Sequence, residues 1–452
     1  MATTPATPQL QVSITNRQIL GIALPITLSL IVPQLNFITN NIFLGSLGQK
    51  ELGNAGITGV YYLIVAVVGN GLNNAIQSLI SRNAGKGDIK AIDVTLMHGI
   101  RIALLFALAG IAFTWLVTPY LLKPFAAADS FAAEMQFLKI RVLGLPFLYL
   151  FQMGNAFLVG TLNSRYLMLG TIVEAGANIL FDYLFIFGHA GFPQLGFNGA
   201  AVASVIAEVV GLLAVTGVIF SLGLKRKFHL FSQTAFNKKA HKAIIHLASP
   251  LVLQYVISLT TWLVFFVMIE GYGERAKAIS NTMRNVFGVV GIFIWAFAST
   301  TNTMVSNLIG QQKQDKVLYA IKRVMLLSFL FASVVAVLLN VFPHLFLSIF
   351  AQGEDFIIDA IPVMRMVTAG MLCMSVASVW LNGLTGTGQT RINVLVEIAA
   401  ILLYLIYNWI IIYHLQWSLT AAWGNEIVYW AVIFIISFTY LRSEKWKKKI
   451  VW

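Results

Sequence analysis

Long apolar stretches dominate this sequence and restrict it to one class of fold. Most are longer than the roughly 20 apolar residues that a helix needs to cross a bilayer. A bilayer offers the backbone no hydrogen-bond partners, so such stretches span it as helices. The pattern predicts an all-α integral membrane protein with twelve transmembrane helices, near residues 19–44, 54–80, 95–122, 138–162, 167–188, 199–222, 244–269, 279–309, 318–349, 360–385, 393–413 and 419–441.

The composition excludes the main soluble classes of protein. Hydrophobic residues make up 58% of the chain and charged residues only 10%, and the mean hydropathy is +0.81. A soluble domain carries about 25% charged residues, which cover its surface. The net charge of +13 fits basic loops beside a membrane, and the basic residues form no face of a soluble domain that would bind nucleic acid. We therefore expect a lipid bilayer as a partner and no nucleic acid.

A basic segment divides the apolar stretches into two sets of six. Twelve spans place both termini on one side of the membrane, and most Lys and Arg residues fall on that side. Because basic loops stay in the cytoplasm, we expect a multi-pass protein of the cell inner membrane with both termini cytoplasmic. The predicted parts are an N-terminal segment 1–18, an N-terminal six-helix lobe 19–223, a cytoplasmic linker 224–243, a C-terminal six-helix lobe 244–441 and a basic tail 442–452.

The two sets also look like copies of each other. Gly160-Thr161 and Gly386-Thr387 each end the fourth helix of a set, 226 residues apart. Asp182 and Asn408 lie at the same spacing in the fifth helices. A duplicated bundle with one orientation in both copies implies a pseudo-twofold axis along the membrane normal, a plan that many transporters use.

Several segments, taken together and in order, resemble one known transporter family. They are Pro25 with the run from Asn40 to Gly48, the turn Gly85-Lys86-Gly87-Asp88, the run from Phe137 to Ile140 followed by Pro146, the run from Asn178 to Asp182, and the run from Leu195 to Ser204. From Pro25 to about Leu441 the chain resembles the multidrug and toxic compound extrusion (MATE) transporters. The resemblance implies a V-shaped pair of six-helix lobes around a central cavity. It also implies secondary antiport: export of organic cations or other amphipathic small molecules, driven by inward flow of H⁺ or Na⁺.

Acidic side chains inside the helices are the strongest functional signal. A charge at membrane depth is costly, by roughly 2.5–3.5 kcal/mol on insertion scales, and usually marks an ion path. Glu174, Asn178 and Asp182 follow each other at four-residue intervals, so they share one face of a helix. Such a face points into the lobe or its cavity. Asp182 is predicted to bind a proton or Na⁺, and its alternative is a structural carboxyl bonded to amides.

The resemblance also supplies a cation-coupling set in the N-terminal lobe. One branch of the family uses an Asp on helix 1, an Asn and an Asp on helix 5 and a hydroxyl residue on helix 6. Here Asn178 and Asp182 match helix 5, Ser204 takes the hydroxyl position and Asn155 on helix 4 lies plausibly close. Asn40 stands where that branch has its helix 1 Asp, which leaves H⁺ and Na⁺ both open. No cofactor is expected, and no metal beyond a possible Na⁺ at Asp182.

Another branch of the family couples through the C-terminal lobe, with a Glu on helix 7 and an Asp on helix 10. Neither acid is present in those two helices of this chain. Glu397 and Glu426, on helices 11 and 12, are possible substitutes, although structural pairing with a neighbour is the stronger interpretation.

Further residues are candidates for the substrate cavity and for gating. Arg284 lies deep in helix 8, whereas Arg141 and Arg365 lie near outer helix ends, from which they are expected to reach the headgroups. Proline removes a backbone hydrogen bond, so Pro25 and Pro33 can bend helix 1. The cavity candidates are Glu174, Gln34, Arg284, Trp262 and Trp380.

Absent motifs narrow the function further. No phosphate-binding loop, His-Glu-x-x-His motif or Gly-x-Ser-x-Gly motif occurs, and Cys373 is the only cysteine. We therefore expect neither ATP drive nor enzymatic activity. Three alternatives remain open: a flippase for a lipid-linked precursor, which needs a strongly basic cavity; an integral membrane enzyme; and a sensor that moves nothing. The internal duplication makes a monomer sufficient.

Overall fold

The computed structural model describes residues 10–123, 130–232, 235–350 and 353–449, and it is helical throughout these ranges. Eleven helical segments of the described chain are long and apolar enough to cross a membrane, and the apolar start of α1, Asn16–Val32, adds a shorter one. The predicted all-α membrane fold is confirmed. The N-terminal lobe holds α1 (Asn16–Leu47), α2 (Gln49–Lys86), α3 (Ile89–Leu116), α5 (Phe131–Arg141), α6 (Leu145–Gly160), α7 (Leu167–Phe187) and α8 (Phe197–Ser221). The C-terminal lobe holds α10 (Lys238–Ile269), α11 (Glu274–Gly310), α12 (Val317–Val341), α14 (Glu354–Thr387), α15 (Thr390–Asn408) and α17 (Asn425–Arg442).

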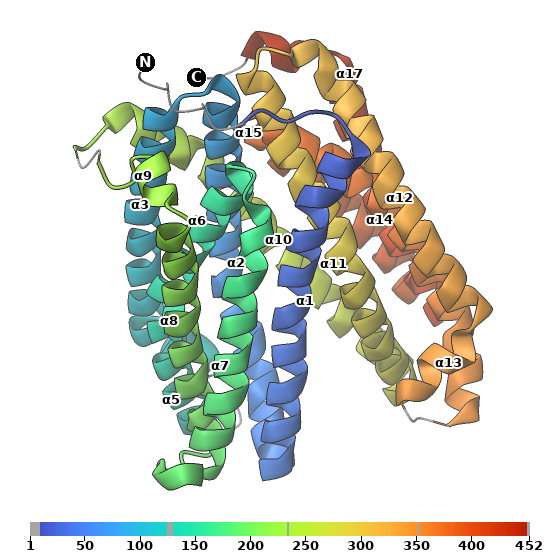
Figure 1. Cartoon of the computed structure of the whole chain (residues 1–452). Coiled ribbons are helices and arrows are strands. Elements are labelled where there is room, and N and C mark those ends of the chain that lie inside the picture. The colour runs from blue at the N-terminus through green and yellow to red at the C-terminus, as the bar shows by residue number, and fades with distance from the viewer. Residues whose placement is uncertain (1–9, 124–129, 233–234, 351–352, 450–452) are drawn as a thin grey trace, which may run out of the picture.

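The two lobes form a V (Figure 1). The blue-to-green N-terminal lobe and the yellow-to-red C-terminal lobe meet near the end that carries both chain termini, and they diverge toward the end that carries α13 (Pro343–Leu347). Helix α1 packs against α7 of its own lobe and against α11 of the other lobe. Helix α2 packs against α10 and α11. These contacts are related by the pseudo-twofold axis, because α1 corresponds to α10 and α2 to α11.

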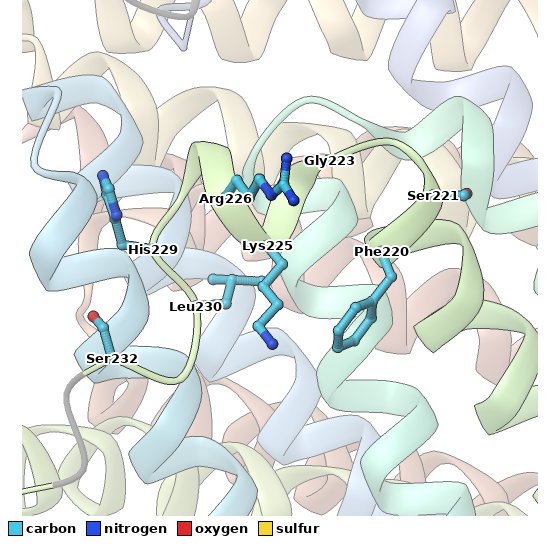
Figure 2. A pocket seen from close by; sticks show the side chains of 8 residues that line it. All are labelled: Phe220, Ser221, Gly223, Lys225, Arg226, His229, Leu230 and Ser232. Carbon is cyan, nitrogen blue, oxygen red and sulfur yellow. The ribbon is translucent and has the colours of Figure 1, made fainter.

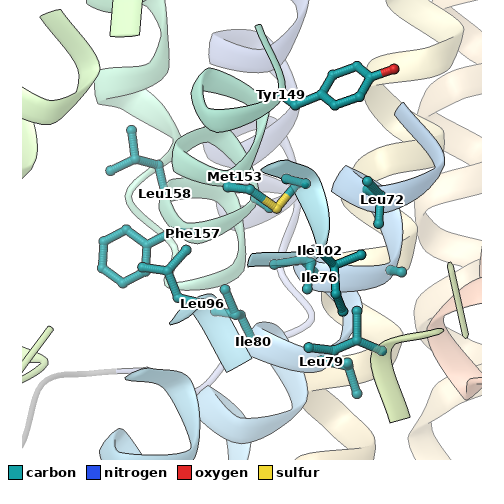
Figure 3. Close-up of a cluster of buried hydrophobic side chains, with 14 of the residues drawn as sticks. Leu72, Ile76, Leu79, Ile80, Leu96, Ile102, Tyr149, Met153, Phe157 and Leu158 are labelled. Carbon is teal, nitrogen blue, oxygen red and sulfur yellow. The ribbon is translucent and has the colours of Figure 1, made fainter. Parts of the chain in front are cut away.

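Apolar packing fills each lobe and continues across their contact: Ile244, Leu247 and Leu251 of α10 join the cluster of the N-terminal lobe, and Ile19, Ile22 and Ile26 of α1 join that of the C-terminal lobe. In the N-terminal lobe, buried side chains of α2, α3 and α6 interlock (Figure 3): Leu72, Ile76, Leu79 and Ile80 face Leu96 and Ile102 on one side and Met153, Phe157 and Leu158 on the other. Many large apolar side chains elsewhere remain exposed on the helices, which is the pattern expected of a surface covered by lipid.

Glycine sets the closest approach of the lobes. A Cβ added to Gly85 of α2 would lie 2.1 Å from the carbonyl oxygen of Asn307 in α11. Reciprocally, a Cβ added to Gly310 of α11 would lie 2.1 Å from the carbonyl oxygen of Arg82 in α2. The two helices therefore cross backbone to backbone, which a larger side chain at either position would prevent.

Polar side chains line the contact between the lobes. The hydroxyl groups of Ser78 and Ser306 are 2.8 Å apart, and Asn302 Nδ2 donates to the carbonyl oxygen of Asn74 at 3.1 Å. Gln77 Nε2 lies 2.8 Å from Thr303 Oγ1. Hydrogen bonds between lobes can be exchanged for water, whereas a fused apolar core cannot open without a large cost. The contact is therefore mixed: its hydrogen bonds can be exchanged for water, whereas its apolar part, where α1 and α10 pack on the other lobe, resists separation.

The linker lies against the N-terminal lobe. Backbone amides of Phe231 and Ser232 donate to the carboxylate of Asp93 in α3 at 2.7 and 3.1 Å. A pocket of about 640 Å³ opens where the chain turns from α8 into α9 (Leu224–Lys227), and Figure 2 shows Lys225 directed past Phe220 while Arg226 extends away. This pocket sits on the linker, away from the predicted coupling residues.

Candidate functional site

Asp182 is a fully buried acid whose carboxylate has no hydrogen-bond donor in the described part of the chain. It lies on α7 with 0% of its surface exposed, and neither carboxylate oxygen accepts a hydrogen bond from the protein. A buried ionised carboxylate without donors carries a desolvation cost of several kcal/mol. Asp182 is therefore stable in this position only when a proton or a bound cation neutralises it.

Oxygen-rich side chains surround the same part of the lobe. Asn178, one turn before Asp182, is buried, and its Nδ2 donates to Ser204 Oγ of α8 at 3.4 Å. The carboxamide oxygens of Asn40 on α1 and Asn155 on α6 are likewise buried and accept no hydrogen bond. The structure thus joins Asn178 to Ser204, and it leaves Asn40 and Asn155 with unused oxygens on helices that contact α7. No protein hydrogen bond links either of these amides to Asp182.

Arg141 does not reach the headgroups as its sequence position suggested. Its guanidinium forms an ion pair with Glu208 of α8 at 2.7 Å, and the two side chains are only 14% and 4% exposed. Tyr62 of α2 donates to the same carboxylate at 2.8 Å and stacks beneath the guanidinium at 3.7 Å. The prediction was wrong because the partner, Glu208, lies 67 residues away in sequence and is placed only by the packing of α5 on α8. Arg365, in contrast, is exposed.

Three cavity candidates lie on the surfaces between the lobes or beside them. Gln34 of α1 faces α11, where a Cβ on Gly288 would lie 3.6 Å from its Nε2. Arg284 of α11 stands 5.8 Å from the ring of Phe266, and no acid pairs with it in the described chain. Trp262 packs edge-on against the same ring at 4.8 Å, so Phe266 brings Arg284 and Trp262 into one group.

Trp380 is not part of that group. It is 2% exposed, its Nε1 donates to the sulfur of Met325 at 3.2 Å, and it packs edge-on against Phe434 and Phe438. The structure therefore places Trp380 in the apolar core of the C-terminal lobe, because the second helix face that covers it comes from α17. This corrects its assignment to the cavity.

Glu397 and Glu426, the buried acids proposed as substitutes in the C-terminal lobe, both have hydrogen-bond partners. Glu397 of α15 accepts from Ser258 and Tyr429, and from Gln254 Nε2 at 3.2 Å. Glu426 accepts from Trp430 Nε1 at 3.0 Å. These contacts fit the structural interpretation of the two acids.

Helix 1 carries both gating candidates within one continuous helix. Pro25 lies in α1, which runs unbroken from Asn16 to Leu47. Pro33 lies in the same helix, and its side chain is outside the described residues.

The lobes differ at the position equivalent to Asp182. Asn408 of α15 stands 226 residues later, and its Oδ1 accepts from Asn425 Nδ2 at 3.0 Å. A neutral amide pair thus occupies in one lobe the place that an unpartnered carboxyl occupies in the other. At this level the N-terminal lobe carries an ionisable group and the C-terminal lobe does not.

Comparisons with known proteins agree with this architecture. The family described as MatE matches residues 25–184 and again residues 250–410, once in each lobe. A relative from Thermotoga maritima, described as a probable multidrug resistance protein NorM, is 24% identical over 98% of this chain and 96% of its own length. A second, from Rhizobium meliloti and described in the same words, is 23% identical over 68% of this chain and 66% of its own.

Solved structures share the fold. A crystal structure of MATE in the straight conformation superposes with a TM-score of 0.88 at 18% identity, covering 99% of this chain and 100% of its own. A transporter of the MOP superfamily from Pyrococcus furiosus, described as having a binding pocket of reverse polarity, gives 0.88 at 18% identity and covers 98% of both chains. The repeated family match spans most of the sequence, and the chain therefore belongs to the MatE family of multi-pass membrane transporters, which are not enzymes.

Proposed function

We propose that this protein is a secondary antiporter that exports organic cations or other amphipathic compounds in exchange for H⁺ or Na⁺, coupled at Asp182. The observation that carries the proposal is the fully buried carboxyl of Asp182, which accepts no hydrogen bond from the protein. The names of the curated relatives, which are multidrug resistance proteins, support the direction and the class of cargo.

The coupling follows from electrostatics. An empty, ionised Asp182 is unfavourable in the closed lobe, so it favours a state in which water or a cation reaches it. A bound cation removes that bias and shifts the equilibrium between the two facing states. Ion and cargo then influence each other's affinity reciprocally, although they occupy different sites.

The choice between an antiporter and a lipid-precursor flippase rests on the charge of the lobe interface. A flippase for an anionic, phosphate-bearing cargo needs several cations in its cavity. Arg284 is one half-buried cation beside the aromatic rings of Phe266 and Trp262. That set suits a flat or weakly polar cargo better than a diphosphate.

Flux measurements in liposomes test the proposal. A fluorescent organic cation is loaded, and a pH gradient or an Na⁺ gradient is imposed in turn. We expect one gradient to drive flux in the wild type and Asp182→Asn to abolish it. Asp355→Asn is the matched control, because it makes the same chemical change on an exposed residue at the start of α14. Coupled transport by Asp182→Asn at the wild-type rate rules out the proposed site.

A further inference from the structure

The N-terminal lobe contains a second group of buried charges beyond Asp182. Arg141, Glu208 and Tyr62 form the ion pair and stacked ring described above, with Glu208 nearly inaccessible. One oxygen of this pair, Glu208 Oε2, and one nitrogen, Arg141 Nη1, are buried without any partner. The pair is thus enclosed in the lobe, and each partner keeps one buried polar atom that makes no hydrogen bond.

Glu174 lies beside this pair. A Cβ added to Gly211 of α8 would meet the Glu174 side chain at 2.9 to 3.0 Å. Gly211 follows Glu208 by three residues, so both lie on the same face of α8. Glu174 and Glu208 are therefore neighbours across the α7–α8 contact, and the charge of Arg141 acts on Glu174 and on Asp182 as well.

The charges of this cluster do not balance. Glu174, Asp182 and Glu208 are three carboxyl groups on the packed helices α7 and α8, and the one guanidinium of the cluster, Arg141, is paired with Glu208. An uncompensated charge inside a membrane protein costs several kcal/mol, so two of the three carboxyls require neutralisation. Among the described helices around α7, the one further buried cation is Arg82 of α2, and its guanidinium donates to the carbonyl oxygen of Gly386 in the other lobe at 3.3 Å. Their remaining charged residues stand near helix ends or on the surface: Arg17 of α1; Lys50, Glu51 and Lys86 of α2; Glu134 and Lys139 of α5.

Glu208 is the carboxyl that pairs with the guanidinium directly. Asp182 and Glu174 are left as the two groups that need a cation. They lie eight residues apart on one face of α7, which corresponds to about 12 Å along the helix axis. We propose that the N-terminal lobe carries two cations per transport cycle, one at Asp182 and a proton at Glu174, with the Arg141–Glu208 pair as a fixed counter-charge.

A proton is the ligand that fits Glu174. This side chain is half-buried, and it forms no hydrogen bond or ion pair in the described structure. An Na⁺ ion needs several oxygen ligands, whereas a carboxylate oxygen takes a proton alone. The proton bonds to one Glu174 oxygen on the side of uptake and leaves the same oxygen on the side of release.

The inference rests on the proposed antiport and predicts the charge moved per cycle. With a monovalent organic cation as cargo, two cations enter for one that leaves, so one net positive charge moves inward. Glu174→Gln removes one of the two entering cations and makes the exchange electroneutral. A membrane potential of 100 mV changes the free energy of one moving charge by about 2.3 kcal/mol, and it changes that of a neutral exchange not at all.

Liposomes test this directly. A potassium gradient with valinomycin sets the voltage, and the fluorescent monovalent cation reports flux without any pH or Na⁺ gradient. We expect an inside-negative voltage to drive wild-type export, with no voltage response in Glu174→Gln and retained flux under a cation gradient. Glu426→Gln is the matched control, a buried carboxyl of the other lobe, and should keep the voltage response.

The outcomes separate the inference from the proposed function. Wild-type flux that a cation gradient drives but voltage does not affect overturns the two-cation count and leaves antiport intact. A Glu174→Gln protein that keeps the voltage response also overturns it. If Glu174→Gln has no flux at all, the number of cations is determined on the wild type instead. The voltage at which wild-type flux reverses against a fixed cargo gradient then distinguishes one entering cation from two. Absence of any gradient-driven flux in the wild type defeats the antiport itself.

Discussion

The side chain of Asn307 holds the backbone of Val12. Val12 N donates to Asn307 Oδ1 at 3.0 Å, and Asn307 Nδ2 donates to the carbonyl oxygen of Leu10 at 2.8 Å. The same Nδ2 also donates to the carbonyl oxygen of Ser81 in α2 at 3.1 Å. One amide of α11 therefore joins the N-terminal segment, residues 10–15, to both lobes at the place where they meet.

Replacing Asn307 with Leu should release this segment. The change keeps the size of the side chain and removes four hydrogen bonds, the three above and one from Gln311 Nε2, each worth about 1 kcal/mol net. We expect amide hydrogen exchange in residues 10–15 to become about tenfold faster or more, as measured by mass spectrometry of the intact protein in detergent. Exchange in α12, which makes no contact with this segment through Asn307, serves as the internal reference. Unchanged exchange at Val12 means that other contacts hold the segment.

A disulfide between the lobes should stop transport. The hydroxyl oxygens of Ser78 and Ser306 are 2.8 Å apart, which brings their Cβ atoms within the range of a disulfide. Because Cys373 is the only natural cysteine, Cys373→Ala provides a clean background. In that background we expect oxidised S78C/S306C to lose flux and dithiothreitol to restore it.

The single variant S78C, treated with the same oxidant, should transport normally. If the cross-linked pair transports at the rate of its reduced form, the lobes need not separate at this contact.

The crossing of α2 and α11 should be intolerant of even one methyl group. Gly85→Ala inserts a Cβ where 2.1 Å separates it from the Asn307 carbonyl, so the helices must shift, at a cost of about 1–3 kcal/mol. We expect a lower thermal unfolding midpoint in detergent. Gly217→Ala in α8 is the matched change, since its Cβ meets nothing within 4 Å, and it should be neutral or stabilising by about 0.5–1 kcal/mol. Equal midpoints for the two variants contradict the close crossing.

Moving the carboxylate from α7 to α1 should restore part of the lost coupling. Asn40 has a buried carboxamide oxygen without a donor, and α1 packs along α7. We expect the double variant N40D/D182N to recover cation-driven flux that D182N lacks, since a carboxyl is again present on a helix that packs against α7. Q34E/D182N is the control, because Gln34 faces α11 instead. Recovery by the control alone places the coupling site between the lobes.

Apolar length was enough to predict the twelve helices, but not where they end. Helix α14 begins at Glu354, six residues before the apolar stretch near 360–385, and α11 begins at Glu274 instead of near residue 279. Polar residues extend these helices beyond the hydrocarbon, where water satisfies their charges. Gly87 and Gly388, both with positive φ, end α2 and α14 as local signals that a sequence does reveal.

The face of α7 was equally visible in the sequence, because four-residue spacing alone aligns Glu174, Asn178 and Asp182. The Arg141–Glu208 pair could not be predicted in this way, because the sequence around either residue gives no sign of its partner. The available signal was Glu208, the one acid of the largely apolar α8: a buried acid needs a donor or a cation, but its sequence position does not indicate which one. Contacts between helices that are distant in sequence determine these pairings, and a spacing rule within one helix cannot predict them.

The neutral amide pair of Asn408 with Asn425 has a consequence for how a duplicated gene diverges. On the proposed mechanism, one cation-operated switch in one copy serves the whole transporter. The counterpart residue in the other copy is then free to take a structural role. Substitutions at Asp182 are expected to abolish coupling, whereas substitutions at Asn408 are expected to lower stability. Duplication accounts for the likeness of the two halves, and the division of roles in the proposed mechanism accounts for their difference at this level.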